Sequence, residues 1–130
     1  MSTLKVNTIQ DTSAGNSTTP VQLSSGRCRG WVNFEQYSSL TVRDSYNVSS
    51  VTDDATATFT VNWDTDMPND DYVTFGQCRN DNGTGKPWMF ADNGINSASD
   101  YATDSVTFKT GDWGSNYDTS HIFVCCFSKG

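Results

Sequence analysis

The sequence predicts an all-β protein built as an antiparallel β-sandwich of the jelly-roll-like kind. Residues of high helix propensity are scarce, and Glu35 is the only glutamate among the 130 residues. Short segments alternate polar and apolar side chains, and clusters of Gly, Ser, Thr, Asn and Asp separate these segments. Several short alternating strands with turn signals between them are typical of a sandwich or a barrel.

The N-terminal part of the chain differs in composition from the rest. Residues 1–9 contain one short apolar alternation, and residues 10–26 are rich in turn formers and poor in bulky side chains. Such a stretch cannot hold a core alone. We therefore expect an extended N-terminal arm over residues 1–25 and a single β-sandwich domain over residues 26–130.

Three segments begin the expected sandwich: "RCRGWVNF" (27–34), "SLTVRD" (39–44) and "ATATFTVNW" (55–63). Their alternation predicts these core-facing side chains: Cys28, Gly30, Val32, Phe34, Leu40, Val42, Ala57, Phe59, Val61 and Trp63. We expect residues 47–54 to form a short bend that lets the second and third segments pair as a hairpin.

Three more segments supply strands in the second half of the chain: "DYVTFGQC" (71–78), "SVTFKT" (105–110) and "HIFVCCF" (121–127). Two long polar loops that carry aromatic residues, 79–104 and 111–120, lie between them, and "KPWMF" is expected to form a short strand within the first. Loops longer than about 12–15 residues are uncommon and are usually functional or flexible.

The charge and hydropathy of the chain exclude several classes of partner. The net charge is −7, and the eight Lys and Arg residues are scattered. Nucleic acid needs a basic footprint, and an anionic membrane surface repels an acidic chain. No stretch approaches the roughly 20 apolar residues of a membrane helix, and no secretory signal is expected. The hydrophobic fraction of 35% suits elements that gain burial from neighbouring subunits.

Residue patterns for catalysis, metal binding or cofactor binding are lacking. The only histidine, His121, directly precedes an apolar run and is expected to be structural. The aspartate-rich stretch 64–71 resembles a calcium loop but lacks its central glycine and terminal glutamate, so a turn with solvated aspartates is favoured. We expect no enzyme activity, no metal and no cofactor.

The chain has four cysteines, Cys28, Cys78, Cys125 and Cys126, and without a secretory signal they are expected to be reduced. A Cys28–Cys78 bridge is the alternative. Zinc ligation lacks the paired C-x-x-C spacing. The stretch Asn47-Val48-Ser49 matches a glycosylation acceptor, but unmodified turn residues are the expectation here.

Aromatic residues in the two long loops are the first candidates for a binding surface. Aromatic rings beside amide and carboxylate groups suit sugars, whose apolar ring faces stack while their hydroxyl groups form hydrogen bonds. The alternative is that these aromatic side chains pack the loops onto the sandwich or fill a subunit interface. The candidate receptor-binding residues are Trp88, Asp92, Asn93, Trp113, Asn116 and Tyr117.

A series of motifs in order carries a resemblance to a known family: "STLKVNTIQDTSAGNS", "WVNF", "RDSYNVSSVTDDATATFTVNW", "DMPNDDYVTFG" and "HIFVCCF". The chain resembles a C-terminal or stand-alone domain of tail-fibre and related receptor-binding proteins of marine and cyanobacterial tailed bacteriophages. The resemblance covers residues 2–76 and the last strand, whereas residues 79–121 match only in general character. Ala14 stands where the family often has glycine.

The resemblance implies a homotrimeric virion protein made in the host cytoplasm, a short tail fibre or fibre tip that adsorbs to polysaccharide or lipopolysaccharide on the host surface. Residues 1–25 would attach the protein to other virion proteins. The main alternative is a virion component without a receptor, such as a capsid decoration protein or a baseplate or fibre adaptor. A depolymerase is disfavoured, since 130 residues leave little room for the long groove of such enzymes.

Overall fold

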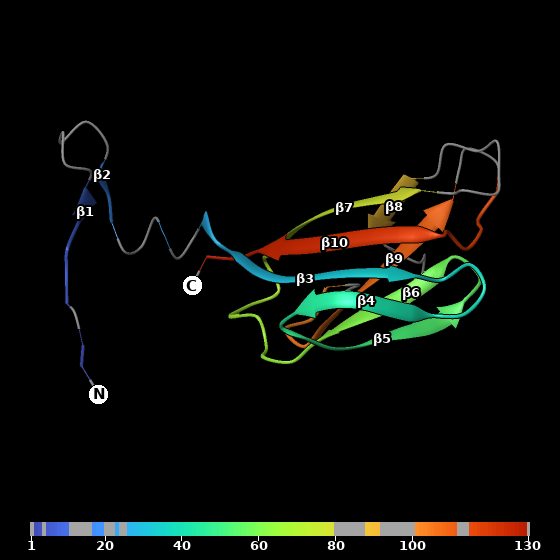
Figure 1. The fold of residues 1–130 in the computed structure, drawn as a ribbon, viewed down its shortest axis with the longest axis horizontal. Coiled ribbons are helices and arrows are strands. Elements are labelled where there is room, and N and C mark those ends of the chain that lie inside the picture. Colours follow the sequence, from blue (N-terminus) through green and yellow to red (C-terminus); the bar gives the residue numbers. More distant parts are fainter. Residues whose placement is uncertain are drawn as a thin grey trace.

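The computed structural model describes residues 2–3, 5–10, 17–19, 23, 26–79, 88–91, 101–111 and 115–129, with the backbone alone at 17–18 and 88–91. Among the described residues Leu23 and Gly26 are helical, and the elements that run through the rest are β-strands, which confirms the all-β prediction. Near the N-terminus, β1 (Ile9–Gln10) pairs antiparallel with β2 (Ser17–Thr18), so the expected arm contains a short hairpin. Figure 1 shows this hairpin apart from the main sheets. The attachment role of residues 1–25 stays a prediction.

Two four-stranded antiparallel sheets form the body of the protein (Figure 1). The first sheet has the order β4-β3-β10-β7, with β3 (Cys28–Glu35), β4 (Thr41–Tyr46), β7 (Val73–Arg79) and β10 (His121–Phe127). The second has the order β5-β6-β9-β8, with β5 (Val48–Ala55), β6 (Thr58–Trp63), β8 (Trp88–Ala91) and β9 (Ser105–Gly111). The strand expected within "KPWMF" is therefore present as β8. The jelly-roll form of the sandwich is not confirmed.

The core lies between the two sheets and is built as the alternation predicts. Phe34 of the first sheet meets Phe59 of the second edge to face, with ring centroids 4.8 Å apart, and Phe59 stacks on Phe108 at 5.5 Å. Both arrangements are favoured by aromatic rings. The core cluster consists of Val32, Phe34, Val51, Phe59, Val61, Trp63, Met67, Tyr72, Val106, Phe108, Ile122, Val124 and Cys126.

Three of the expected core positions differ in detail. Cys28 does not face the core: the register shift between Cys126 and Phe127 pairs Cys28 with Phe127, and Cys28 lies beside Trp31 on the outward side of its sheet. Val42 is 40% exposed because β4 is the edge strand of its sheet, where one side of the strand has no neighbour to cover it. Ala57 is fully buried as expected but lies in the turn before β6, with φ of 64°. Leu40 packs against the core as predicted.

The expected bend over residues 47–54 is wrong. Residues 48–55 form β5, which pairs with β6, whereas the segment expected to pair with β6 forms β4 and pairs with β3. Only Val51 of β5 is buried, since β5 lies at the edge of its sheet and its outward side chains are polar. An edge strand with one buried side chain gives almost no alternation signal, and the adjacent aspartates imitate a turn.

Asn47 forms the corner at which the chain leaves the first sheet and enters the second. Its φ is 55°, a left-handed conformation that asparagine tolerates better than most residues. Its side chain makes two hydrogen bonds to the Thr65 backbone: Nδ2 donates to the carbonyl oxygen at 3.0 Å and Oδ1 accepts from the amide at 2.8 Å. The Asp64 amide also donates to the Asn47 carbonyl oxygen at 3.2 Å. The corner and the segment after β6 are thus held together.

Two substitutions at Asn47 separate backbone conformation from hydrogen bonding. Asn47→Gly keeps the left-handed conformation and loses the two side-chain hydrogen bonds, so we expect a loss of about 1–2 kcal/mol. Asn47→Ala loses both features, and we expect an additional loss of about 1 kcal/mol. Urea unfolding of the three proteins measures the two steps. Equal stability of the alanine and glycine variants would show that the corner conformation is not constraining.

A buried polar network supports the same end of the core. The Trp63 Nε1 donates to the Tyr72 hydroxyl at 3.3 Å, and that hydroxyl lies 2.9 Å from the Ala102 carbonyl oxygen and 2.8 Å from that of Ser105. Burial raises the pKa of Tyr72 from 10.0 to about 12. Burial also raises the pKa of the Cys126 thiol from 9.0 to about 12.

These pKa values predict a loss of stability in alkaline solution. A buried acid with a raised pKa stays neutral in the folded protein, so its contribution is complete below the pKa of the unfolded chain and is lost as pH rises toward the folded value. For Tyr72 this window runs from pH 10 to about 12. Between pH 9 and pH 11, the free energy of unfolding should decrease in both proteins. The decrease should be about 1.4 kcal/mol smaller in Tyr72→Phe than in the wild type. Identical losses in the two proteins would contradict this assignment.

Candidate binding face

The outward side of the first sheet carries most of the exposed large apolar side chains of the described sandwich. Successive side chains of a strand point to opposite faces, so the residues between the core positions of β3, β10 and β7 point outward. Together with outward residues of β4 they form the outer face, arranged in cross-strand rows. From the end near Arg79 to the end near Arg27 the members are His121 and Arg79; Asp44, Asn33, Phe123 and Gln77; Tyr46, Trp31, Cys125 and Phe75; Cys28, Phe127 and Val73.

The second of these rows, the amide row, places an aromatic ring between two amide groups. Phe123 of β10 lies directly opposite Asn33 of β3 on one side and Gln77 of β7 on the other. Directly paired side chains have Cβ atoms about 4.5–5.5 Å apart. Within the described part of the chain neither amide group makes a hydrogen bond, and Phe123 is 38% exposed. These side chains line a shallow pocket of about 240 Å³.

Polar groups close the outer face at the end near Arg79. Ser120 Oγ donates to the Arg79 carbonyl oxygen at 3.0 Å and lies 3.3 Å from His121 Nδ1. Arg43 forms an ion pair with Glu35 at 2.7 Å, and the same guanidinium group donates to the Ser120 carbonyl oxygen at 3.1 Å. These contacts tie the start of β10 to its neighbour β7 and, across β3, to β4. The amide row therefore has a charged border on this side.

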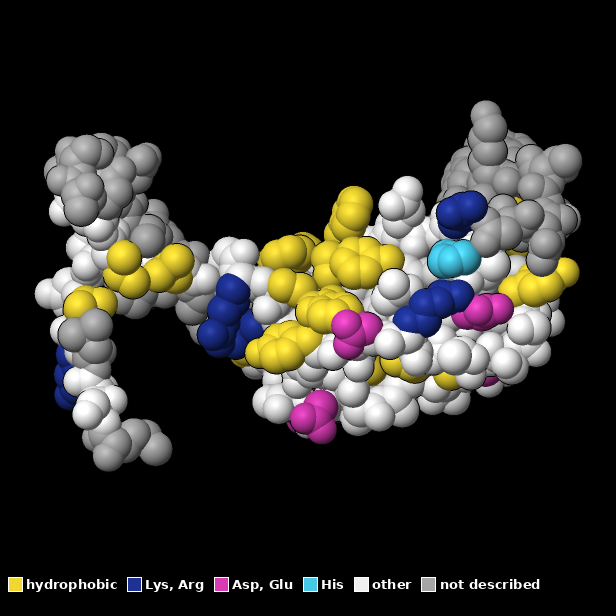
Figure 2. All heavy atoms as spheres, in the orientation of Figure 1, with side chains coloured by type: hydrophobic (Ala, Val, Ile, Leu, Met, Phe, Trp, Pro, Cys, Tyr) yellow, Lys and Arg dark blue, Asp and Glu magenta, His cyan; other side chains and the backbone are white. Residues whose placement is uncertain are grey.

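The third and fourth rows, called here the apolar rows, cover the opposite half of the outer face. Phe75 and Val73 are 65% and 64% exposed because β7 is an edge strand. Cys125 points outward yet is only 7% exposed, since Trp31 and Phe75 flank it directly. Figure 2 shows hydrophobic side chains gathered over this half, with Lys and Arg side chains on either side of them. The face thus changes from polar to apolar along the strands.

The outward side of the second sheet provides a contrast. Thr60 Oγ1 lies 2.8 Å from Thr107 Oγ1 and donates to Asp54 at 2.7 Å. Asn62 Nδ2 donates to the hydroxyl groups of Ser50 and Thr52, both at 3.1 Å. These side chains satisfy one another within the sheet. The outer face of the first sheet, with exposed rings and unbonded amide groups, is the surface suited to a partner.

The four cysteines are free thiols in the structure. The alternative Cys28–Cys78 bridge is excluded, because β3 and β7 lie on either side of β10 and their Cα atoms are more than about 9 Å apart, beyond the reach of a disulfide. Burial raises the pKa of Cys78 from 9.0 to about 11, and it also raises the pKa of Cys125. Buried thiols with raised pKa values are poor nucleophiles, so the structure gives them a packing role.

The structure describes two of the six candidate receptor-binding residues in full. Asn116 is exposed and forms an isolated β-bridge with Gly111. A Cβ atom added at Gly111 would lie 2.7 Å from the Ser115 carbonyl oxygen. Tyr117 is half-buried, and its carbonyl oxygen accepts a hydrogen bond from Thr110 Oγ1 at 2.9 Å. Asp92, Asn93 and Trp113 lie outside the described residues, and Trp88 is described by its backbone alone.

The two ends of the expected loop 79–104 lie at opposite ends of the sandwich. Trp88 pairs with Gly111 at the end where Asn116 lies. Tyr101 forms a bridge with Val106, and the Asp104 carbonyl oxygen accepts from the Trp63 amide at 2.8 Å, at the other end. The described parts of the two loops therefore do not gather on a single face, because β8 reverses the chain between them.

The aspartate-rich segment 64–71 has the solvated arrangement expected from the sequence. Its aspartates are exposed, while Met67 is only 3% exposed and fixes the segment to the core. Among the described residues, no three His, Cys, Asp or Glu side chains gather as they would around a metal ion. The described segments also contain no helix long and apolar enough to cross a membrane.

Sequence reasoning missed the amide row, although one signal was visible. The stretch "HIFVCCF" is apolar at both alternating positions after His121, so one face of β10 carries exposed apolar side chains or is covered.

Comparison with protein-family models, curated proteins and solved structures finds no match.

Proposed function

We propose that this protein is a structural component of a bacteriophage virion, a homotrimeric short tail fibre or fibre tip that binds carbohydrate on the host surface through its outer face. The observation that carries the proposal is the amide row, in which Phe123 lies between Asn33 and Gln77. The ordered motifs that resemble tail-fibre domains supply the virion context. The protein is a binding protein and has no catalytic role in this proposal.

The amide row matches the chemistry of a sugar ring. The apolar face of a sugar stacks on an aromatic ring, and its hydroxyl groups at the ring edge need donors and acceptors. Phe123 supplies the exposed ring, and each flanking amide supplies both a donor and an acceptor. The side chains belong to three adjacent strands of one sheet, so the site needs little ordering when it binds. Weak single sites on several trimers act together at a cell surface.

The edge strand β7 supports the trimeric part of the proposal. Within the described residues β7 pairs only with β10, so its other edge has free backbone groups beside Val73 and Phe75. Exposed apolar edge strands are surfaces on which another chain packs. A threefold ring buries this edge in each subunit by a repeated head-to-tail contact. Residues 1–25 then attach the trimer to other virion proteins.

Substitutions at Phe123 test the carbohydrate site. Phe123→Leu retains an apolar side chain and removes the ring, so we expect about ten-fold weaker binding, which corresponds to about 1.4 kcal/mol. Phe123→Trp retains a stacking surface and should bind. The measurement is binding to an array of bacterial surface polysaccharides and lipopolysaccharides, followed by calorimetry with the best ligand. Tyr37→Leu removes an exposed aromatic ring in the loop between β3 and β4 and is the matched control.

Equal binding by wild type, Phe123→Leu and Tyr37→Leu would remove the amide row from the binding site. An array on which the wild-type protein binds nothing would contradict the carbohydrate proposal itself.

Substitutions on β7 test the trimer. The double variant Val73→Ser with Phe75→Ser should sediment as a monomer, whereas the wild type should show three times the 14.3 kDa mass of the chain. Val42→Ser changes an exposed valine on the opposite edge strand of the same sheet and should remain trimeric. Analytical ultracentrifugation at micromolar concentrations gives the masses. A monomeric wild-type protein, or a trimeric double variant, would contradict this arrangement.

The apolar rows favour a second candidate function, a virion component without a receptor. A pocket of about 440 Å³ lined by Cys28, Trp31, Phe123, Cys125 and Phe127 offers almost no polar group. Such a surface suits a protein partner better than a sugar. In this case the protein is a capsid decoration protein or a baseplate or fibre adaptor. Cryo-electron microscopy of the particle distinguishes the candidates, since a decoration protein lies on the head and a fibre on the tail.

A further inference from the structure

A second pocket, the arginine pocket, lies at the end of the outer face near the N-terminal arm. It has a volume of about 170 Å³, and β3, the Asn47 corner and the segment after β6 contribute its lining. The side chains that define it are Arg27, Arg29, Tyr46, Asn47, Met67 and Pro68. We propose that the arginine pocket binds an oxyanion, a carboxylate or phosphate group carried by a sugar residue of an acidic glycan. This inference rests on the proposed carbohydrate-binding function and names the class of glycan.

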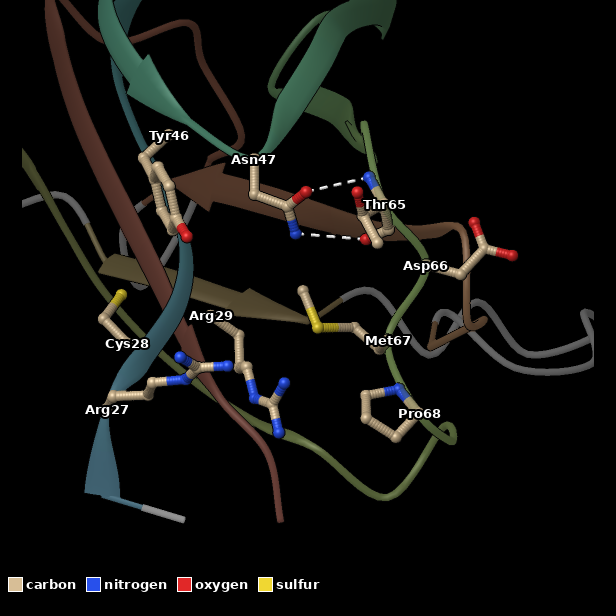
Figure 3. Close-up of a pocket in the computed structure, with 9 residues that line it drawn as sticks. All are labelled: Arg27, Cys28, Arg29, Tyr46, Asn47, Thr65, Asp66, Met67 and Pro68. Atoms are coloured by element: carbon tan, nitrogen blue, oxygen red, sulfur yellow. Dashed lines mark hydrogen bonds between the residues drawn. The ribbon is translucent and has the colours of Figure 1, made fainter. Parts of the chain in front are cut away.

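The pocket holds two guanidinium groups that have no anionic partner among the described residues. Figure 3 shows the side chains of Arg27 and Arg29 next to each other in the pocket, opposite Met67 and Pro68. Arg29 Nε donates to the Ser128 carbonyl oxygen at 3.4 Å, and this contact leaves its terminal nitrogens available. Neither arginine forms an ion pair with a described residue. Asp66 lines the same pocket, but Figure 3 shows its carboxylate turned away from both arginines.

The charge of the whole chain makes this arrangement unusual. The protein has fifteen acidic and eight Lys and Arg residues, so an arginine has many possible carboxylate partners. Two neighbouring guanidinium groups repel each other, and an oxyanion between them removes the repulsion and forms charge-assisted hydrogen bonds. The planar fork of arginine matches a carboxylate or phosphate in a bidentate way. A chain of net charge −7 is therefore equipped for an anion at this pocket.

The wall opposite the arginines is formed before any ligand binds. The two hydrogen bonds between Asn47 and the Thr65 backbone hold the corner against the segment after β6. The Met67 amide donates to the Thr103 carbonyl oxygen at 2.7 Å, and the Met67 side chain is only 3% exposed. The pocket therefore keeps its shape without a ligand, which lowers the entropic cost of binding.

The position of the arginine pocket links it to the rest of the outer face. Tyr46 lines the pocket, is 57% exposed, and lies directly opposite Trp31 in the third row. Trp31 and Asn33 are two positions apart on one face of β3, about 7 Å along the strand. A glycan chain that stacks on Phe123 reaches the arginines by crossing Trp31 and Tyr46. The neutral amide row and the cationic pocket then select an acidic glycan together.

Binding of defined oligosaccharides to the full-length protein tests the inference. The probes are an oligogalacturonate, the same oligomer as its neutral methyl ester, and mannose 6-phosphate, which separates phosphate from carboxylate. We expect the acidic oligomer to bind at least ten-fold more tightly than its ester, with an affinity that falls as salt increases. Arg27→Gln with Arg29→Gln should remove this difference. Lys109→Gln removes one positive charge from the outward side of the second sheet, away from the outer face, and should leave this difference unchanged.

A site-resolved measurement keeps the test independent of affinity alone. In the ¹⁵N-labelled protein, the side-chain Nε–H signals of Arg27 and Arg29 should shift when the oligogalacturonate or mannose 6-phosphate is added. The signal of Arg43 should not shift. A double variant with lysine at both positions keeps the charge and loses the bidentate geometry, so it should bind the acidic oligomer with intermediate affinity.

The outcomes separate this inference from the proposed function. Equal binding of acid and ester, or unchanged binding by the double glutamine variant, overturns the arginine pocket while Phe123-dependent carbohydrate binding stands. Dissociation of the trimer in the double glutamine variant also overturns it, because the arginines then pair with carboxylates of a second copy. If no glycan on the array binds the wild-type protein, the proposed function fails first. Arginine signals that shift with mannose 6-phosphate alone limit the oxyanion to phosphate.

Discussion

The packing of β3 and β10 against the second sheet is the constraint on which the rest of the structure depends. Val32 and Phe34 on β3, and Ile122 and Val124 on β10, must face inward to form the core. Because side chains alternate along a strand, their neighbours must then face outward, whatever their chemistry. Trp31, Asn33, Phe123 and Cys125 point to the outer face for this reason, and the pairing of three strands sets them in rows. The candidate binding face is thus a direct consequence of the core.

The outward side chains of the two sheets differ in hydrogen bonding and exposure, although both sheets follow the same alternation. On the second sheet the outward threonines and Asn62 form hydrogen bonds among themselves, so that surface is satisfied in water. On the first sheet, Asn33 and Gln77 make no hydrogen bond within the described residues, and Phe75 is mostly exposed. Large exposed apolar side chains cost solvation free energy unless a partner covers them. This difference makes the outer face of the first sheet the surface better suited to a partner.

The corner at Asn47 connects the stability of the fold with the shape of the arginine pocket. The chain changes sheets there, and the amide group of Asn47 holds the segment after β6 against this corner. The same segment places Met67 against the core and Pro68 against the pocket. Asn47, whose sequence context matches a glycosylation acceptor, thus stabilises this corner through its side-chain hydrogen bonds. Its side chain is already engaged by the Thr65 backbone, which is consistent with the expectation that it is unmodified.

The sequence by itself determined the all-β class, the core faces of β6 and of β3 from Gly30 onward, and the short strand β8, because alternation over several residues reflects burial directly. It could not determine that residues 48–55 form an edge strand, since only Val51 is buried there. The order of the strands in the two sheets decided which side chains lie together at the candidate sites. The placement of Asn33, Phe123 and Gln77 in one row, and of Arg27 beside the Asn47 corner, depends on contacts between residues far apart in the chain. Such contacts leave no local pattern, so only the tertiary structure reveals them.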